Sequence, residues 1–355
     1  MQRIRGLLGA LLALIVGLSA ASAQKAPPPK TPALPPINPA IAKLDQTAEA
    51  LDGPGTALAV RPTSDLLVAA CEDHSLRYWS KDGANPLRVA DTKPHVLKGH
   101  DAPVTAVAVA GGSVASASVD GKIVLWMVPG DKAARTLKAP GPVRALALSP
   151  DGKTLASAGD DAAVQLWDAA TGQPKSKLTG ATDWLLALTF SPDGKSVIAG
   201  GYDGRLRSWD VASGKKGIDV PAQPAAPPKT PAPPANVVHA VAFSPDGKLI
   251  AVGGSDARID LFQAADGKLV RSMPGHTSTI AALVFHPSGS VLVSAGKDRT
   301  IRLWNAANGQ MLKSLEGHTA WVQGVAFLDD GTRLASVGAD RTVRLWNLTE
   351  PPKKK

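Results

Sequence analysis

The chain of 355 residues carries a single cysteine, Cys71, which excludes an intramolecular disulfide. Its net charge is +9, but residues 46–352 carry only +2, because the excess lies in the first 45 residues and the last three. A nucleic-acid-binding domain should carry basic clusters on its folded body, so the sequence argues against nucleic acid as a partner.

The first 23 residues have the pattern of a secretory signal peptide. Arg3 and Arg5 precede an apolar run at residues 7–18, and Ala21, Ser22 and Ala23 are small residues suited to cleavage after Ala23. An uncleaved membrane anchor is the alternative, but the run is shorter than the roughly 20 residues of a spanning helix. We therefore expect an exported bacterial protein without a stable membrane span after cleavage, located in the periplasm or at the cell surface.

Two proline-rich stretches follow along the chain, a linker at residues 24–45 and a segment at 221–236, and both contain the letters PPKTPA. Proline fixes the backbone and removes an amide donor, so both are predicted to be extended spacers. A motif for a proline-binding groove is the alternative for either stretch. Between them, Cys71 lies in the strand-like sequence VAACEDHS, which favours a buried, inert thiol over a reactive one.

A tryptophan or its substitute recurs at the end of an alternating strand throughout the remaining sequence. The sequence KDRTIRLWN (297–305) returns almost unchanged as ADRTVRLWN (339–347). The complete series is Trp79, Trp126, Trp167, Trp209, Phe262, Trp304 and Trp346, at intervals of 47, 41, 42, 53, 42 and 42. A period of roughly 40–45 residues is typical of four-stranded propeller blades. The long interval contains the 221–236 stretch, which is therefore predicted to be a loop insertion.

The sixth repeat shows why these units should stack. A turn, HPSG, separates its first two strands, and other repeats have SPDGK there, with proline and glycine at positions that favour a turn. In TIRLW, Ile301 and Leu303 point to one face of the sheet and Trp304 to the other. Both faces must then be buried between other sheets. We expect an all-β, seven-bladed β-propeller of four-stranded antiparallel blades over residues 46–349, with a basic tail at 350–355. The N-terminal sequence TAEAL (47–51) is expected to supply the strand that closes the ring.

The combination of GH, SPDGK and D-x-x-[VI]-R-L-W-[DN] resembles the WD40 repeat family. In that family a buried network joins a loop histidine, a serine or threonine, the turn aspartate and the tryptophan. Three repeats have all four residues: His100, Ser116, Asp120 and Trp126; His276, Ser294, Asp298 and Trp304; His318, Ser336, Asp340 and Trp346. The third repeat lacks the histidine, the fourth has Ala199 for the serine, and the fifth ends in Phe262. The turn aspartate persists in the weaker copies as Asp73, Asp161, Asp203 and Asp256. Blades without the full network are expected to be looser.

The resemblance also implies a function. Histidine, aspartate and serine recur in register with the fold period, so we assign them to the scaffold and predict no catalytic residue, no metal site and no cofactor. The family's partner contacts often lie on its top face, which carries the loops that lead into each blade and the turn between its second and third strands. The candidates there are Trp184, Trp321, Tyr202, Lys297 and Glu72. Each tryptophan could instead pack on neighbouring loops.

We therefore predict a non-enzymatic, monomeric interaction scaffold that binds a protein or peptide at the cell envelope. One alternative is a propeller enzyme or small-ligand binder with its site at the channel mouth of the top face. The other is a structural envelope component bound through the bottom face.

Overall fold

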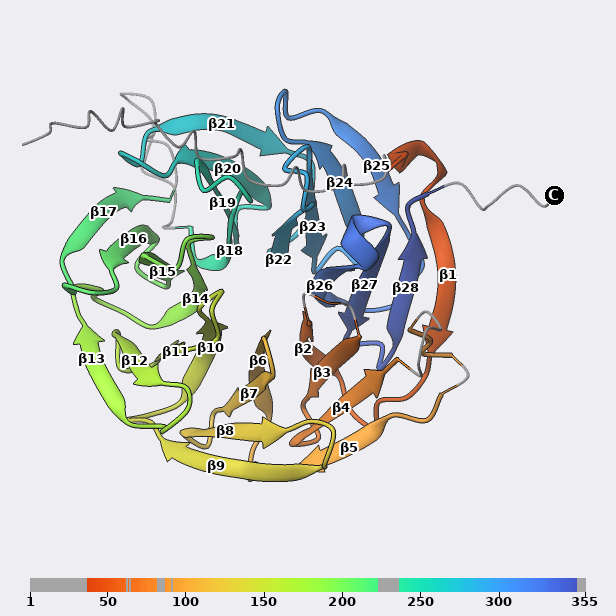
Figure 1. Ribbon diagram of the computed structural model, residues 1–355. Helices are drawn as coiled ribbons and strands as arrows, with labels where there is room; N and C mark the ends of the chain where they lie inside the picture. The colour runs from red at the N-terminus through yellow and green to blue at the C-terminus, as the bar shows by residue number, and fades with distance from the viewer. Residues whose placement is uncertain are drawn as a thin grey trace, which may run out of the picture. The chain divides into compact units, whose positions relative to one another are not determined.

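The computed structural model describes residues 37–61, 63, 65–81, 87–90, 92–222 and 236–349. These residues form seven antiparallel sheets of four strands each, arranged as blades around a central axis (Figure 1). The predicted all-β, seven-bladed propeller is therefore confirmed. The expected signal peptide, the tail and most of the 221–236 insertion lie outside the described residues.

The first four blades follow one another along the chain. Blade 1 contains β2 (Gly55–Val60), β3 (Leu66–Cys71), β4 (Ser75–Ser80) and β5 (His95–Lys98). Blade 2 contains β6 (Val104–Ala110), β7 (Ser113–Ser118), β8 (Lys122–Met127) and β9 (Lys132–Lys138). Blade 3 contains β10 (Val143–Leu148), β11 (Thr154–Gly159), β12 (Val164–Asp168) and β13 (Pro174–Leu178). Blade 4 contains β14 (Leu185–Phe190), β15 (Ser196–Gly201), β16 (Arg205–Asp210) and β17 (Lys216–Pro221).

The last three blades include the one that closes the ring. Blade 5 contains β18 (Val238–Phe243), β19 (Leu249–Gly254), β20 (Arg258–Gln263) and β21 (Leu269–Pro274). Blade 6 contains β22 (Ile280–Phe285), β23 (Val291–Gly296), β24 (Ile301–Asn305) and β25 (Met311–Leu315). Blade 7 contains β26 (Val322–Leu328), β27 (Arg333–Gly338), β28 (Val343–Asn347) and, from the other end of the chain, β1 (Lys43–Ala48). Two short 3-10 helices, η1 (Pro39–Ile41) and η2 (Asp329–Gly331), complete the described elements.

The SPDGK sequences make the turns between the first and second strands. In blade 3, the Asp151 carboxylate accepts hydrogen bonds from the Ser149 hydroxyl at 2.6 Å and from the amide of Lys153 at 3.0 Å. Gly152 has a φ of +70°, which a residue without a Cβ adopts at little cost. The same sequence therefore forms the same turn in each blade that carries it.

The core consists of contacts between neighbouring blades. The tryptophan at the end of a third strand packs with a large apolar residue from the third strand of the preceding blade, as Trp304 does with Leu261. Five other interfaces have the same arrangement: Trp79 with Leu345, Trp126 with Tyr78, Trp167 with Leu125, Trp209 with Leu166, and Trp346 with Leu303. Between blades 4 and 5 these two positions hold Ser208 and Phe262. That interface therefore has the smallest pair of side chains.

The ring closes slightly earlier in the sequence than expected. The closing strand is β1, in which Lys43 is paired with Asn347 and Ala48 with Val343, and it only overlaps the expected TAEAL segment (47–51). Residues before 46 thus contribute to the propeller. The amide of Asn38 donates to the carbonyl of Leu348 at 3.0 Å, so the two described ends of the chain lie side by side. β1 is visible beside β28 at the right of Figure 1.

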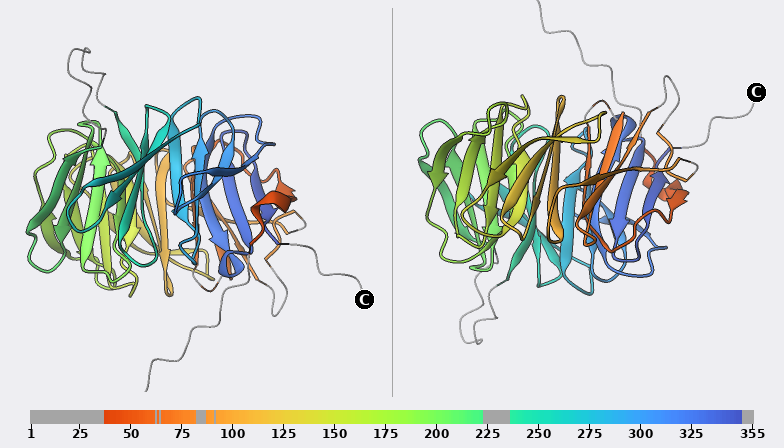
Figure 2. Two further views of the ribbon diagram at one scale, coloured as in Figure 1. Left: turned by 90° about the horizontal axis from the view of Figure 1, so that it is seen from above. Right: turned by 90° about the horizontal axis from the view of Figure 1, so that it is seen from below.

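The loops define two faces. The loops that lead into β14, β18 and β26 lie on the top face, together with the turns between the second and third strands of each blade. η2 lies at the opposite, bottom face, as Figure 2 shows from the side. All five predicted partner-binding residues are in loops of the top face.

Candidate functional site

Blades 6 and 7 contain the complete polar network. In blade 6, His276 is 2.8 Å from the Asp298 carboxylate through Nδ1 and 2.7 Å from Ser294 Oγ through Nε2. Trp304 Nε1 donates to the same Ser294 oxygen at 2.8 Å. Blade 7 repeats these contacts at 2.8, 2.7 and 2.9 Å with His318, Asp340, Ser336 and Trp346. These polar groups are buried and satisfy one another.

In blade 2 the same network has one longer distance, between the histidine and the aspartate. His100 Nε2 and Trp126 Nε1 lie 2.7 and 2.8 Å from Ser116 Oγ, but His100 Nδ1 is 3.4 Å from Asp120. Burial lowers the pKa of His100 below its usual value. The structure thus brings together all twelve predicted network residues, four in each of three blades.

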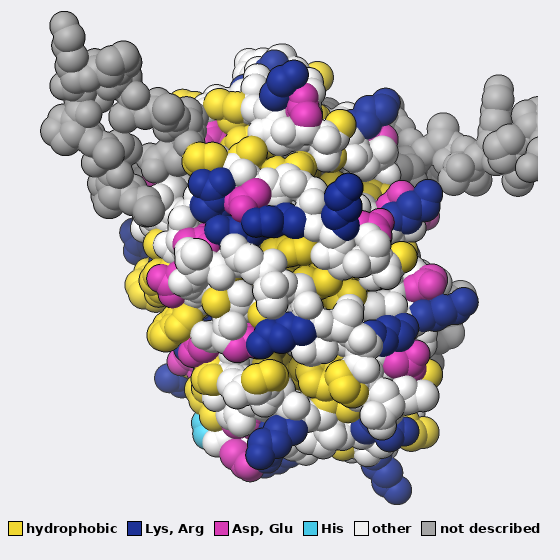
Figure 3. Space-filling model, turned by 90° about the vertical axis from the view of Figure 1, so that its left-hand side faces the viewer, with side chains coloured by type: hydrophobic (Ala, Val, Ile, Leu, Met, Phe, Trp, Pro, Cys, Tyr) yellow, Lys and Arg dark blue, Asp and Glu magenta, His cyan; other side chains and the backbone are white. Residues whose placement is uncertain are grey.

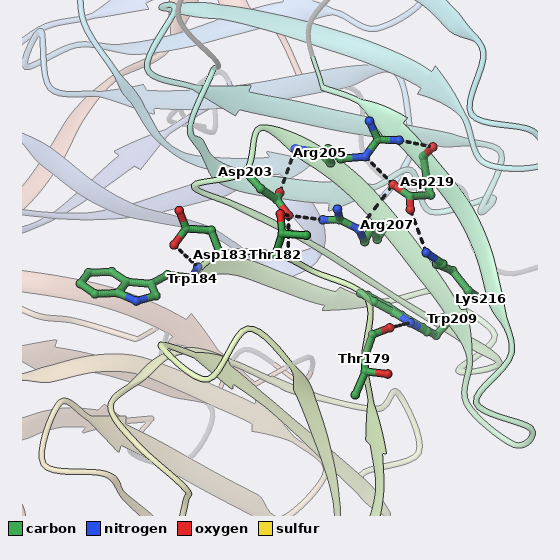
Figure 4. Close-up of polar contacts among 10 residues, drawn as sticks. All are labelled: Thr179, Thr182, Asp183, Trp184, Asp203, Arg205, Arg207, Trp209, Lys216 and Asp219. Atoms are coloured by element: carbon green, nitrogen blue, oxygen red, sulfur yellow. Dashed lines mark hydrogen bonds and ion pairs between the residues drawn. The ribbon is translucent and has the colours of Figure 1, made fainter.

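The remaining blades lack the histidine and have different polar contacts. Blade 3 keeps only the bond from Trp167 to Ser157, at 2.8 Å. In blade 4, Trp209 donates to the carbonyl of Thr179 at 3.0 Å, and the buried Arg207 pairs with Asp203 and Asp219. Figure 4 shows this cluster. In blade 1, the buried Arg77 pairs with Asp52 and Asp73. An arginine two residues before the tryptophan thus pairs with the turn aspartate in blades 1 and 4, and the arginines at this position in blades 6 and 7 lie 3.6 and 3.7 Å from theirs in addition to the histidine.

Trp184 is held out from the top face by the turn of its own blade. The amide of Thr182 donates to Asp203 at 3.1 Å, and the amide of Tyr202 donates to the Trp184 carbonyl at 2.9 Å. The indole is 41% exposed and extends away from the Asp203–Arg207 cluster in Figure 4. Tyr202, 44% exposed, lies edge-on to it with ring centres 5.6 Å apart. The Arg144 guanidinium covers the indole at 5.1 Å from a ring centre.

Trp321 has the same support in blade 7. The amide of Thr319 donates to Asp340 at 3.0 Å, and the amide of Ala339 donates to the Trp321 carbonyl at 2.8 Å. The indole is 49% exposed, and Lys297 Nζ lies 4.7 Å from a ring centre. Each predicted tryptophan therefore carries a cation from the preceding blade, while the side chain remains about half exposed.

The five predicted residues form two groups and one separate side chain. Trp184 and Tyr202 form the first group and Trp321 and Lys297 the second, on blades that lie three positions apart around the channel. Glu72 is exposed in the turn between β3 and β4 of blade 1, and the described structure shows no contact between it and the other four. The sequence placed all five on one face but did not predict their pairing.

The sequence did not predict a ring of residues that lines the central channel. In every blade the first strand contains a register shift, and the shifted residue lines the central channel, which has a volume of about 240 Å³. The polar members are Thr56, Thr105, Arg144, His239 and Gln323. Burial and the charge of Lys297 lower the pKa of His239 to about 4. In six of the seven blades this residue lies 23 positions before the terminal tryptophan or Phe262, which is the signal that would have located it.

The described residues have no candidate metal site, no membrane-spanning helix and no reactive cysteine. They contain no group of three or more histidine, cysteine, aspartate or glutamate residues able to hold a metal ion. Within the same part of the chain, no helix is long and apolar enough to cross a membrane. Cys71 is buried, and burial raises the pKa of its thiol to about 12, which keeps it protonated.

Charges of both signs are mixed on the rim. Figure 3 shows the side of the molecule at the left of Figure 1, where β13 and β17 lie, and lysine, arginine, aspartate and glutamate alternate across it with apolar groups between them. Many of these charges are paired, as Lys177 is with Asp161 and Lys216 with Asp219. This side of the molecule has no continuous basic patch of the kind that binds nucleic acid.

Comparisons with known proteins agree with the repeat pattern. The family model described as "WD domain, G-beta repeat" matches residues 51–80, 91–127, 132–168, 172–210, 267–305 and 309–347, together more than half of the chain. The model described as "Anaphase-promoting complex subunit 4 WD40 domain" matches residues 229–280. Both matches lie in the region that forms the seven blades.

Similar proteins share part of the chain. Nuclear distribution protein PAC1 of Arthroderma otae is 35% identical over 130 residues, which cover 33% of this chain and 27% of PAC1. F-box-like/WD repeat-containing protein TBL1X of Homo sapiens is 31% identical over 128 residues, which cover 34% of this chain and 22% of TBL1X. The chain thus spans about a quarter of the length of these relatives. Both are eukaryotic, so the likeness does not support the expectation of an exported bacterial protein.

Proposed function

Because the chain belongs to the WD40 repeat family, we propose that it is a non-enzymatic scaffold that binds a protein or peptide through its top face. The observation that carries this proposal is the pair of tryptophans, Trp184 and Trp321, held half-exposed on opposite sides of the channel mouth. Tryptophan, tyrosine and arginine are enriched among the residues that contribute most to binding at protein interfaces. Two anchors on separate blades suit an extended segment or a broad surface.

The contacts that hold the two tryptophans favour a role in partner binding over mere packing on neighbouring loops. Each carbonyl accepts an amide from the turn between the second and third strands, so the loop is ordered before a partner arrives. Each indole also has its own cation, Arg144 or Lys297, at 5.1 or 4.7 Å. An ordered site loses less conformational entropy on binding. The preformed geometry therefore suits recognition of a partner.

The test is a pull-down with the full chain and a Trp184→Ala, Trp321→Ala variant. Met127, which is 60% exposed and lies at the end of β8, provides the control variant Met127→Ala. We expect a partner captured by the wild type and by Met127→Ala to be lost by the double variant, with all three showing the same circular dichroism spectrum. A partner retained by the double variant would refute the top-face proposal and direct attention to the bottom face or the rim.

Export is a separate proposal that rests on residues 1–23. Their basic start, apolar run and small residues support a signal peptide cleaved after Ala23. Mass spectrometry of the protein from its native source should find a mature chain that starts at Gln24. An intact N-terminus in that sample would contradict export by this route.

A further inference from the structure

A large cavity lies between blades 4 and 5, on the bottom face and away from the two tryptophans. Its volume is about 860 Å³, and Ile198, Ile218, Phe243 and Ile250 contribute apolar side chains to its wall. The turns that separate the first and second strands of the two blades, at residues 191–193 and 245–248, form its mouth. Pockets for small molecules have typical volumes of about 300–1,000 Å³ and mostly apolar walls.

The cavity lies where two repeat positions depart from the pattern. The other six interfaces each pair a tryptophan with leucine or tyrosine, but here Phe262 replaces the tryptophan and Ser208 replaces the leucine. Ile198 is the largest side chain at its register, where other blades have alanine or valine, and it refills only part of the space. Ser208 lines the cavity, and Phe262 belongs to the same interface without lining it. Because close packing is the rule in protein interiors, the small side chain at position 208 leaves room for a ligand.

Ser208 is one of the neutral polar residues in a mostly apolar wall, which also includes Ser196 and Gln263. Its oxygen accepts the amide of Ile218 at 2.8 Å, and its hydroxyl hydrogen has no acceptor among the described residues. The charged residues Asp193, Asp246 and Lys248 stand at the mouth, where each aspartate accepts a hydrogen bond from a serine of its own turn at 2.6 Å. A ligand below the mouth would therefore meet a small number of neutral polar groups, of which Ser208 is one.

We propose that this cavity binds a small, uncharged and mostly apolar molecule that accepts one hydrogen bond from Ser208. Burial of apolar surface supplies the binding free energy, and the hydroxyl orients the ligand. Charged molecules are disfavoured, because Asp193, Asp246 and Lys248 stand at the mouth and the rest of the wall offers only neutral side chains in exchange for their hydration. This site is independent of the top-face scaffold function, since it lies on the other face and uses none of its residues.

The experiment measures two fluorinated probes by ¹⁹F NMR with the full chain. 4-Fluoroacetophenone has a carbonyl acceptor, and fluorobenzene has none. Ser208→Leu restores the residue of five other blades and should fill the cavity, so we expect at least tenfold weaker binding of both probes. Ser208→Ala should weaken the binding of the ketone alone. The expected loss is roughly 2- to 10-fold, which is the net contribution of one neutral hydrogen bond.

Two results would contradict the proposed binding site. Wild-type protein that binds neither probe, or a folded Ser208→Leu variant that binds both as tightly as the wild type, would overturn the proposal. Ser208→Ala keeps the test decisive if the leucine variant does not fold, because it removes only one oxygen. Equal weakening of both probes by Ser208→Ala would contradict the orienting role of the hydroxyl.

Discussion

Blades 6 and 7 differ from blades 4 and 5 in the polar contacts of their interiors, although all four keep the turn aspartate and the same order of strands. Blades 6 and 7 contain the histidine–serine–aspartate–tryptophan network and tryptophan–leucine packing. Blade 4 contains Arg207 between Asp203 and Asp219, and blade 5 contains Arg258 between Asp256 and Asp260. The comparison indicates that turns and strand alternation specify the blade, whereas the interior network can change locally.

The two regions also differ in how well buried groups are satisfied. In blade 5, Arg258 Nη2 and Asp260 Oδ1 are buried without hydrogen-bond partners in the described structure. Burial raises the pKa of both Asp256 and Asp260. In blades 6 and 7, burial acts in the same direction, but hydrogen bonds from the histidines and other donors outweigh it and lower the pKa of Asp298 and Asp340. The arginine–aspartate cluster of blade 5 is thus less completely satisfied than the histidine networks of blades 6 and 7, although His286 and Arg333 of those blades also have a buried side-chain nitrogen without a partner in the described structure.

The largest predicted effect separates complete from partial networks. Ser294→Ala in blade 6 removes the partner of both His276 and Trp304, and we expect a loss of about 2–4 kcal/mol in the free energy of unfolding. Ser157→Ala in blade 3 removes the partner of Trp167 alone and should cost about 1–2 kcal/mol. Urea unfolding measures both. Equal losses would show that the histidine contributes nothing to the network.

The second prediction concerns acid. The pKa of Asp340 is lowered to about 2, so its contribution to stability is present above its ordinary value near 4 and is lost as the pH falls from about 4 to 2. The raised pKa of Asp260 has the opposite sign, because the folded state binds the proton more tightly and gains stability as the pH falls. Asp340→Asn should therefore flatten the decline of Tm below pH 4, and Asp260→Asn should steepen it.

Melting curves from pH 7 to pH 2 for the wild type and both variants check the second prediction. At neutral pH, Asp340→Asn should also cost about 1–3 kcal/mol, because hydrogen bonds to a charged group are lost. If the Tm of all three proteins fell in parallel with pH, the prediction that Asp340 and Asp260 change stability in opposite directions would be wrong.

The smallest predicted effect is in the turns of the top face. Arg299 in blade 6 has a φ of +70°, whereas blade 4 has Gly204 at the equivalent position with a φ of +65°. Arg299→Gly should relieve the strain of the left-handed backbone and raise the free energy of unfolding by up to about 1 kcal/mol. Gly204→Ala is the converse change and should cost about 1 kcal/mol. Urea midpoints for both variants test this, and a destabilised Arg299→Gly protein would show that the guanidinium makes stabilising contacts.

The sequence was sufficient for the blades because the tryptophan period is strong. It located the closing strand only approximately, since three of the six side chains of KLDQTA are exposed and the strand shows no clear alternation. It placed Trp184 and Trp321 correctly on the top face from their register. Their capping by Arg144 and Lys297 could not be predicted, because each contact joins two blades.

Two further features needed the structure for a similar reason. The channel ring depends on a register shift in each first strand, and an alternating pattern with a period of two does not reveal such a shift. The departures at Ser208 and Phe262 are visible in the sequence as separate events, 54 residues apart. Only the arrangement of neighbouring blades shows that they border the same interface.

The pairing of β1 with β28 determines how the propeller responds to mechanical tension. Lys43 is paired with Asn347, directly beside the contact between Asn38 and Leu348, and the remaining pairs follow inward to Ala48 and Val343. A pulling force applied at residues 37 and 349 therefore loads these pairs one at a time, as in a zipper, and not all together in shear. We expect the seventh blade to yield first under such tension, while the other six blades remain intact until it has opened.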